Sequence, residues 1–265
     1  MNPQQTNNPI DILEDFIKYP TTQISADQTL VVPGTSVFFP SLEMGPRSKL
    51  LIPSHFTSCN IIIGKGSFDA DTEIVADGDN GQDGIKPKDS WDSTGWWQAD
   101  GGQPGLKGVA GTSGTPGGPA VQNVKIQIGL TKLIRLNIHA NGGNGGKGGN
   151  GGMGQIGGNK SGMFGSNGAG GAGGDAGSGS NGGRGGNVLV EVWAADSTLD
   201  LDAILQYLSV NASGGSAGKK GGPGSGREAG NNSGPHGGPG REGNDGLAGQ
   251  DVPTQLIKIS KPPLP

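Results

Sequence analysis

Hydrophobic and polar residues alternate with a period of two in several short stretches, and each such stretch predicts a half-buried β-strand. Residues 28–64 contain four of them, separated by Pro, Gly and Ser turns, at positions 30–32, 36–39, 50–52 and 60–63. Short strands at this spacing are typical of a β-solenoid or a β-sandwich. We therefore predict a mainly β fold and favour a β-solenoid, with a β-sandwich as the alternative.

The same alternation recurs around three glycine-rich stretches further along the chain. A short strand that ends in Ala-x-Gly precedes each stretch, and the alanines Ala76, Ala140 and Ala212 are 64 and 72 residues apart. An alternating strand rich in β-branched residues follows each stretch, at residues 121–128, 187–193 and 252–259. The chain is therefore expected to contain three long units, each made of a strand, a glycine-rich excursion and a return strand.

The glycines are concentrated in these excursions, since 51 of the 56 lie within residues 78–118, 142–186 and 214–249. They recur every third residue, and the positions expected to be structural include Gly105, Gly108, Gly111, Gly142, Gly145, Gly148, Gly151, Gly237, Gly240 and Gly243. Three residues per turn is the period of the polyproline II helix. Helices with two bare faces can approach closely and hydrogen-bond laterally. We expect the three excursions to pack as a polyglycine II helix bundle.

Two other glycine-rich structures fit this pattern less well. Collagen needs a longer, unbroken register and more proline than these blocks contain. A flexible glycine-serine linker remains the alternative, but flexibility requires no register of three. The regular spacing therefore favours the bundle.

The chain divides into three parts on this basis: residues 1–27, 28–77 and 78–265. Asn8-Pro9-Ile10-Asp11 is a helix start signal, and the apolar residues Ile10, Leu13, Phe16 and Ile17 then share one helical face. We predict a short amino-terminal helix, which either caps the open end of the solenoid or docks onto a neighbouring subunit or fibre. Residues 197–208 predict a second short helix or a further strand.

Composition narrows the class of protein. Gly 56 and Pro 18 exceed a quarter of the 265 residues, while hydrophobic residues are 31% and aromatic residues 5%. These values exclude a single ordinary α/β enzyme with one continuous core. The net charge of −4 gives no reason to expect nucleic acid or an anionic membrane as a partner. The single cysteine, Cys59, excludes an intrachain disulfide and is expected to be a buried small hydrophobe.

The sequence around each candidate catalytic or metal-binding motif argues against that function. Residues 214–218 match the nucleophile-elbow pattern, but the glycine- and proline-rich sequence that follows cannot form the helix that the elbow requires. The histidines His55, His139 and His236 lack the spacing of zinc ligands. We therefore predict a non-enzymatic protein without a metal or other cofactor.

One segment interrupts the glycine register of the first block. Residues 86–100 contain Trp91, Trp96 and Trp97, beside the acidic residues Asp89 and Asp92. Aromatic faces near carboxylates suit stacking on sugars or burial in a protein partner. The second block has a matching insertion around Phe164, and the third has one near residues 227–232. We expect these insertions to be turns at the bundle tip that bind a partner, unless the tryptophans fold back over the glycine face.

The blocks at 142–158 and 234–249, alternating with non-glycine insertions, resemble the polyglycine II domains of the long-tail-fibre adhesins of T-even-like bacteriophages. They also resemble the glycine-triplet antifreeze protein of snow fleas. The adhesin resemblance implies that the glycine motifs build the bundle and that the intervening loops bind a receptor. By that resemblance, Trp91, Trp96, Trp97 and Phe164 would form the receptor-binding tip.

The leading functional hypothesis is a recognition or attachment protein, borne by a cell surface or a phage, whose partner is a cell-surface glycan or protein receptor. A structural subunit of an extracellular filament or sheath, binding identical subunits, is the alternative. Ice binding is disfavoured by the charged residues in the blocks, and a hydrolytic β-helix by the lack of clustered carboxylates. Residues 1–19 lack a Sec-type signal pattern, so an extracellular or particle-associated location would require another route.

Overall fold

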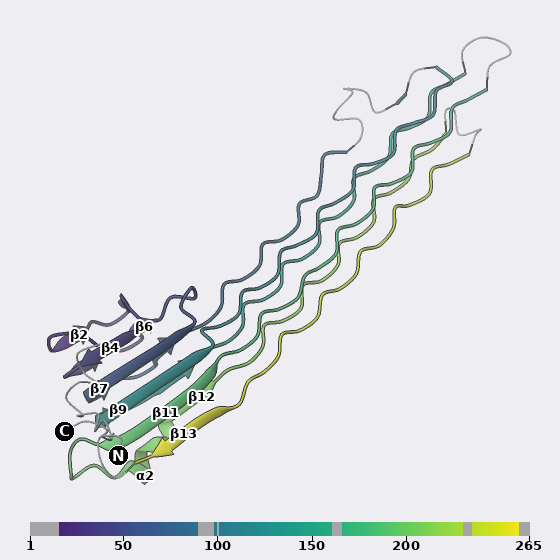
Figure 1. Ribbon diagram of the computed structural model, residues 1–265. Coiled ribbons are helices and arrows are strands. Elements are labelled where there is room, and N and C mark those ends of the chain that lie inside the picture. Colours follow the sequence, from purple (N-terminus) through teal and green to yellow (C-terminus); the bar gives the residue numbers. More distant parts are fainter. Residues whose placement is uncertain (1–15, 90–97, 100, 161–165, 230–234, 260–265) are drawn as a thin grey trace, which may run out of the picture.

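The computed structural model describes residues 16–89, 98–99, 101–160, 166–229 and 235–259. Figure 1 shows strands gathered at one end of the molecule and six glycine-rich segments that run away from them side by side. The protein is mainly β, with two parallel sheets and one short helix. Among the described residues, no helix has the length and apolar character needed to cross a membrane.

The first sheet has eight strands, in the order β1-β4-β7-β9-β11-β13, with β5 paired to β7 and β2 paired to β5. Its strands are β1 (Ile17–Lys18), β2 (Thr22–Ile24), β4 (Ser36–Phe39), β5 (Leu42–Met44), β7 (Ser58–Phe68), β9 (Asn123–Leu133), β11 (Asn187–Ala194) and β13 (Thr254–Lys258). The second sheet has the order β12-β10-β8-β6-β3. Its strands are β3 (Thr29–Val31), β6 (Lys49–Leu51), β8 (Thr72–Val75), β10 (Leu136–His139) and β12 (Leu208–Asn211).

The hydrophobic core consists of rows of side chains that run across parallel strands. Strand register aligns Val37 with Ile61, Ile61 with Ile126 and Ile126 with Val190, and all four side chains are fully buried. The second sheet contributes a matching row, including Leu50, which is aligned with the buried Ile74 of β8. Because every second residue of these strands faces inward, the alternation in the sequence maps directly onto the core.

Most predicted strands are confirmed, and the second predicted helix is present in shortened form. Helix α2 (Leu201–Ile204) is capped by Asp200, whose carboxylate accepts hydrogen bonds from backbone amides of the first turn. A 3₁₀ turn, η2 (Leu205–Tyr207), follows it and leads directly into β12.

The prediction of an amino-terminal helix is wrong at Ile17. This residue lies in β1 and pairs with Val37 of β4, so the backbone is extended there. Its side chain packs against Gly34, where an added Cβ would lie 2.6 Å from the Ile17 Cδ1 atom. Parallel pairing to β4 supplies backbone hydrogen bonds that a helix end would lack. The preceding Phe16 is buried, and Ile10 and Leu13 lie outside the described residues.

The glycine-rich segments connect the second sheet to the first. We call them legs 1 to 6 in chain order: 77–89, 102–120, 141–158, 168–186, 213–229 and 235–252. Legs 1, 3 and 5 leave from β8, β10 and β12, and legs 2, 4 and 6 return into β9, β11 and β13. Each outward and return pair is one of the three predicted excursions.

Backbone hydrogen bonds join neighbouring legs at every third residue. Leg 3 donates to leg 5 from Gly142, Gly145 and Gly148, whose amides bond the carbonyls 71 residues later at 2.8–2.9 Å. The next residue of each triplet, beginning at Gly143, donates instead to leg 2. Legs 3 and 4 each contact four other legs through such bonds, whereas legs 1 and 6 contact two. Legs 3 and 4 therefore donate backbone hydrogen bonds from more than one side of the same leg.

The third residue of many triplets carries a side-chain oxygen that bonds the backbone of the next leg. Asn80 and Asp83 of leg 1 accept from the amides of Asn144 and Lys147, each at 2.8 Å. Asn144 in turn accepts from the Ser216 amide of leg 5 at 2.9 Å. A matching ladder on the opposite layer joins leg 4 to leg 6. These side chains satisfy donors that the backbone carbonyls leave unpaired.

Replacing Asn144 with alanine should lower the free energy of unfolding by about 1 kcal/mol, because the change removes acceptors for the Ser216 amide and hydroxyl. Urea denaturation monitored by circular dichroism would measure this loss. Asn144→Asp is the matched control, since it keeps the accepting oxygen, and its loss should be smaller. Equal losses for both variants would contradict the role of this oxygen.

Among the six legs, proline occurs in legs 1, 2, 5 and 6 and is absent from legs 3 and 4. Legs 1 and 2 contain prolines 87, 104, 116 and 119, and legs 5 and 6 contain prolines 223, 235 and 239. Legs 3 and 4 contain none. Proline has no backbone amide hydrogen, so it cannot donate to a neighbouring leg. Its absence from legs 3 and 4 follows from their position between other legs.

Candidate functional site

The tip residues expected to bind a partner fall mostly outside the described part of the chain. Trp91, Asp92, Trp96, Trp97 and Phe164 all belong to the undescribed segments 90–97 and 161–165.

Asp89 is the described member of that set, and its role there is a backbone contact. Its carboxylate accepts a hydrogen bond from the Met153 amide at 2.8 Å and lies 3.5 Å from the Lys86 ammonium. Only 12% of its side chain is exposed. Asp89 therefore extends the ladder of side-chain oxygens between legs 1 and 3.

Backbone hydrogen bonds join the described flanks of the three insertions far from the sheets. The Ala99 amide bonds the carbonyl of Ile156, which ties the end of the first turn to leg 3. The Gly157 amide bonds the Glu228 carbonyl, which ties leg 3 to the start of the third turn. The Gly168 amide bonds the Gly158 carbonyl at 2.8 Å, which ties together the two flanks of the second insertion. The legs thus bring the flanks of three separate loops to one end of the molecule (Figure 1).

One tryptophan is fully described, and it packs on a glycine. Trp193 of β11 is 6% exposed, and its ring lies so close to Gly129 that an added Cβ would be 2.8 Å from the indole. Trp193 thus shows that a tryptophan ring of this chain can be buried against the bare backbone of a glycine.

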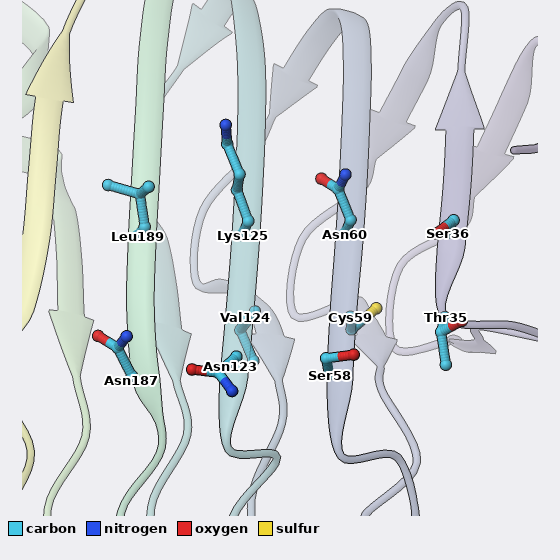
Figure 2. Close-up of a pocket in the computed structure, with 10 residues that line it drawn as sticks. All are labelled: Thr35, Ser36, Ser58, Cys59, Asn60, Asn123, Val124, Lys125, Asn187 and Leu189. Atoms are coloured by element: carbon cyan, nitrogen blue, oxygen red, sulfur yellow. The ribbon is translucent and has the colours of Figure 1, made fainter. Parts of the chain in front are cut away.

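A cavity of about 320 Å³ lies on the first sheet, where four of its strands begin. Figure 2 shows two rows of side chains across β4, β7, β9 and β11. The row at the strand starts consists of Ser58, Asn123 and Asn187, and the next outward-facing row consists of Ser36, Asn60, Lys125 and Leu189. Thr35 precedes β4 and lies level with Cys59. Parallel register places these residues opposite one another, about 4.8 Å apart from strand to strand.

The polar groups of this cavity are unequally satisfied. The Lys125 ammonium lies 3.2 Å from the Glu191 carboxylate, so its charge is balanced. The Asn60 Oδ1 atom is buried, and no donor among the described residues reaches it. A buried acceptor without a donor costs about 1–3 kcal/mol. Cys59 lies between these rows but faces the core, and burial raises the pKa of its thiol to about 12.

This cavity was not predicted from the sequence. Its signal in the sequence is a Ser or Asn at the first position of β7, β9 and β11, followed by alternating strand residues. Parallel register brings these positions together, but the sequence alone does not give the register.

A second polar groove, of about 340 Å³, lies on the outer face of the second sheet. The His139 Nδ1 atom lies 2.9 Å from the Asp77 carboxylate, and its Nε2 atom lies 3.8 Å from Glu73. Glu73 also pairs with Lys49 at 2.7 Å. The hydrogen bond with Asp77 raises the pKa of His139 above its ordinary value, although burial opposes the shift.

Protonated His139 should therefore stabilise the fold. Its raised pKa means that this contribution is complete below the unfolded-state pKa of about 6.5 and is lost as the pH rises through the folded-state pKa. The stability difference between the wild type and His139→Gln, measured by urea denaturation from pH 5 to pH 8.5, should shrink as pH increases. A pH-independent difference would contradict the ion pair with Asp77.

Among the described residues, no group of three or more His, Cys, Asp and Glu side chains could hold a metal ion.

No protein-family model, curated protein or solved structure matches the chain. A proposal for its function therefore depends on the geometry of the legs, the tip and the two polar surfaces.

Proposed function

We propose that the chain is a non-enzymatic recognition or attachment protein, in which a rigid glycine-rich scaffold carries binding loops at its far end. The observation that carries this proposal is that backbone hydrogen bonds hold the flanks of three separate non-glycine insertions at one end of the legs. Loops on a rigid scaffold are the usual place for recognition, because the scaffold fixes their relative positions.

We propose further that the scaffold is a polyglycine II bundle built on a β-solenoid. The bundle is supported by hydrogen bonds with a period of three and by leg glycines that contact the backbone of neighbouring legs. The solenoid is supported by parallel pairing and by a chain that passes repeatedly between two sheets. A leg of 17 residues, the length of leg 5, would be about 53 Å long in this conformation.

The partner that fits this arrangement is a cell-surface glycan or protein receptor. The adhesin resemblance supports this partner, since its variable loops occupy the corresponding place between glycine blocks. Trp96 and Trp97, with Trp91 and Phe164, are the proposed contacts. Their aromatic rings would supply the large apolar contact area of a binding hot spot.

The test compares binding of the fluorescently labelled protein to intact cells and glycan arrays. Trp96→Ala combined with Trp97→Ala should abolish binding while circular dichroism stays unchanged. Leu247→Ala is the matched control, because Leu247 is 70% exposed but lies on leg 6 near the sheets. Undiminished binding by the double variant would refute the tip assignment.

A filament subunit is the second candidate, favoured by the exposed edge strand β13. Four of its five residues are exposed, and it pairs with β11 on one side. An unpaired edge is a template for another chain. Negative-stain microscopy over a range of concentrations separates the two functions: long uniform filaments would support assembly, and discrete short rods would support recognition.

A further inference from the structure

We propose that the cavity on the first sheet is a second binding site, specific for a neutral saccharide. It lies at the strand starts of β7, β9 and β11, at the base of the legs, where legs 2 and 4 enter β9 and β11 (Figures 1 and 2). The length of the legs separates it from the tip. The site is independent of the tip loops. It would hold a ligand even if the tryptophan segment had only a packing role.

The first argument is the arrangement of hydrogen-bonding groups. Ser58, Asn123 and Asn187 occupy equivalent positions on three adjacent parallel strands, and all three are exposed. Each asparagine amide presents both a donor and an acceptor, and a serine hydroxyl does the same. A row of such groups at the strand spacing complements a ligand that carries several hydroxyls, each of which also donates and accepts.

The second argument is the unsatisfied oxygen of Asn60. This atom is buried at the cavity, and no donor in the described part of the chain bonds it. Buried polar atoms without partners are rare in native proteins and call for an explanation. Rotation of the Asn60 side chain toward the cavity would expose this oxygen to a ligand hydroxyl, which would supply the missing hydrogen bond.

The third argument is charge. Lys125 is the only charged side chain among the ten that line the cavity, and Glu191 balances it at 3.2 Å. The cavity therefore offers no net attraction to a phosphate, a carboxylate or a cation. Leu189 and the methylene stem of Lys125 add apolar surface suited to the C–H face of a sugar ring. The volume of about 320 Å³ lies at the lower end of the range for small-ligand sites and suits a monosaccharide or disaccharide.

The experiment is saturation-transfer NMR with the whole chain and a defined panel of probes. The panel consists of maltose, lactose and N,N′-diacetylchitobiose as neutral saccharides, with glucuronic acid as the anionic comparison. At least one neutral saccharide should show transfer with a millimolar Kd, and glucuronic acid should show none. Absence of transfer to every neutral probe, or transfer to glucuronic acid alone, would overturn the proposal.

Variants locate the binding within the molecule. Asn123→Ala and Asn60→Ala should each weaken binding at least tenfold. Asn60→Ala removes an acceptor that lacks a donor, so its thermal midpoint should be no lower than that of the wild type. Asn244→Ala, on exposed leg 6, is the matched control and should bind as the wild type does.

The double variant Trp96→Ala, Trp97→Ala separates this site from the proposed tip. It should retain full saccharide binding in the NMR assay, whatever its effect on cell attachment. Loss of saccharide binding in this variant, with Asn123→Ala and Asn60→Ala unaffected, would assign the ligand to the tip and refute the cavity.

Discussion

Replacing Gly148 with alanine is expected to destabilise the protein by more than about 3 kcal/mol. A Cβ at this position would lie 2.0 Å from the Gly177 carbonyl oxygen and 2.8 Å from the Gly221 amide nitrogen. Both atoms belong to the backbones of neighbouring legs, so no side-chain rotation can relieve the overlap. Relief requires separation of legs 3, 4 and 5, which breaks hydrogen bonds along their length. Chemical denaturation or differential scanning calorimetry would measure the loss.

Gly238→Ala is the matched control for this prediction. Nothing lies within 4 Å of a Cβ built at Gly238, although it is also a leg glycine. Its stability should be unchanged or raised by up to about 1 kcal/mol, because alanine reduces the conformational freedom of the unfolded chain. Equal effects at Gly148 and Gly238 would show that glycine acts here through flexibility rather than through close approach.

Ile126→Ala should cost about 3 kcal/mol, the second large effect. Ile126 is fully buried and aligned between Ile61 of β7 and Val190 of β11. Truncation removes its apolar contacts and leaves a cavity in the middle of a row, which the flanking strands cannot close without disturbing their register. Urea denaturation would measure the change.

Ile126→Val is the matched control, because it shortens the same side chain by less. It removes one methylene group and should cost about 1 kcal/mol. Similar losses for the two variants would mean that the row tolerates rearrangement and that the sheets are less tightly packed than the burial of these side chains indicates.

The strands were predictable because a half-buried strand has a period of two. The first residues of β9 and most of β11 alternate between core and outer face, and their sequences carry that alternation, whereas β7 contains three consecutive isoleucines. The repeat distances of 64 and 72 residues were equally informative. They reappear as the separations of hydrogen-bonded pairs such as Asn80 with Asn144, and Asn144 with Ser216.

Short elements at the amino-terminal end were harder to predict. β2 and β5 have three residues each, too few to display a period, and β1 has two. The apolar spacing predicts a helix through Ile17, because local spacing contains no information about the partner strand β4. Tertiary pairing decided the backbone conformation at that position.

The role of the third residue in each triplet was also missed. The triplet period predicts the glycines as the structural positions, but it assigns no role to the intervening Asn, Asp and Ser residues. Their oxygens face the amide of the next leg only after the legs have been placed side by side. The absence of proline from legs 3 and 4 was a signal for the same arrangement, since it marks the two segments with neighbours on several sides.

The direction of the bonds between legs has a mechanical consequence. They join legs that run side by side, so they cross from one leg to the next and do not run along a leg. A force that pulls the tip away from the sheets would therefore load many of these bonds in shear at the same moment, instead of breaking them one after another. Sliding a leg past its neighbours would also require moving it by a whole triplet before the donors and acceptors meet again. We therefore expect the legs to resist extension when tension is applied between the tip and the sheets.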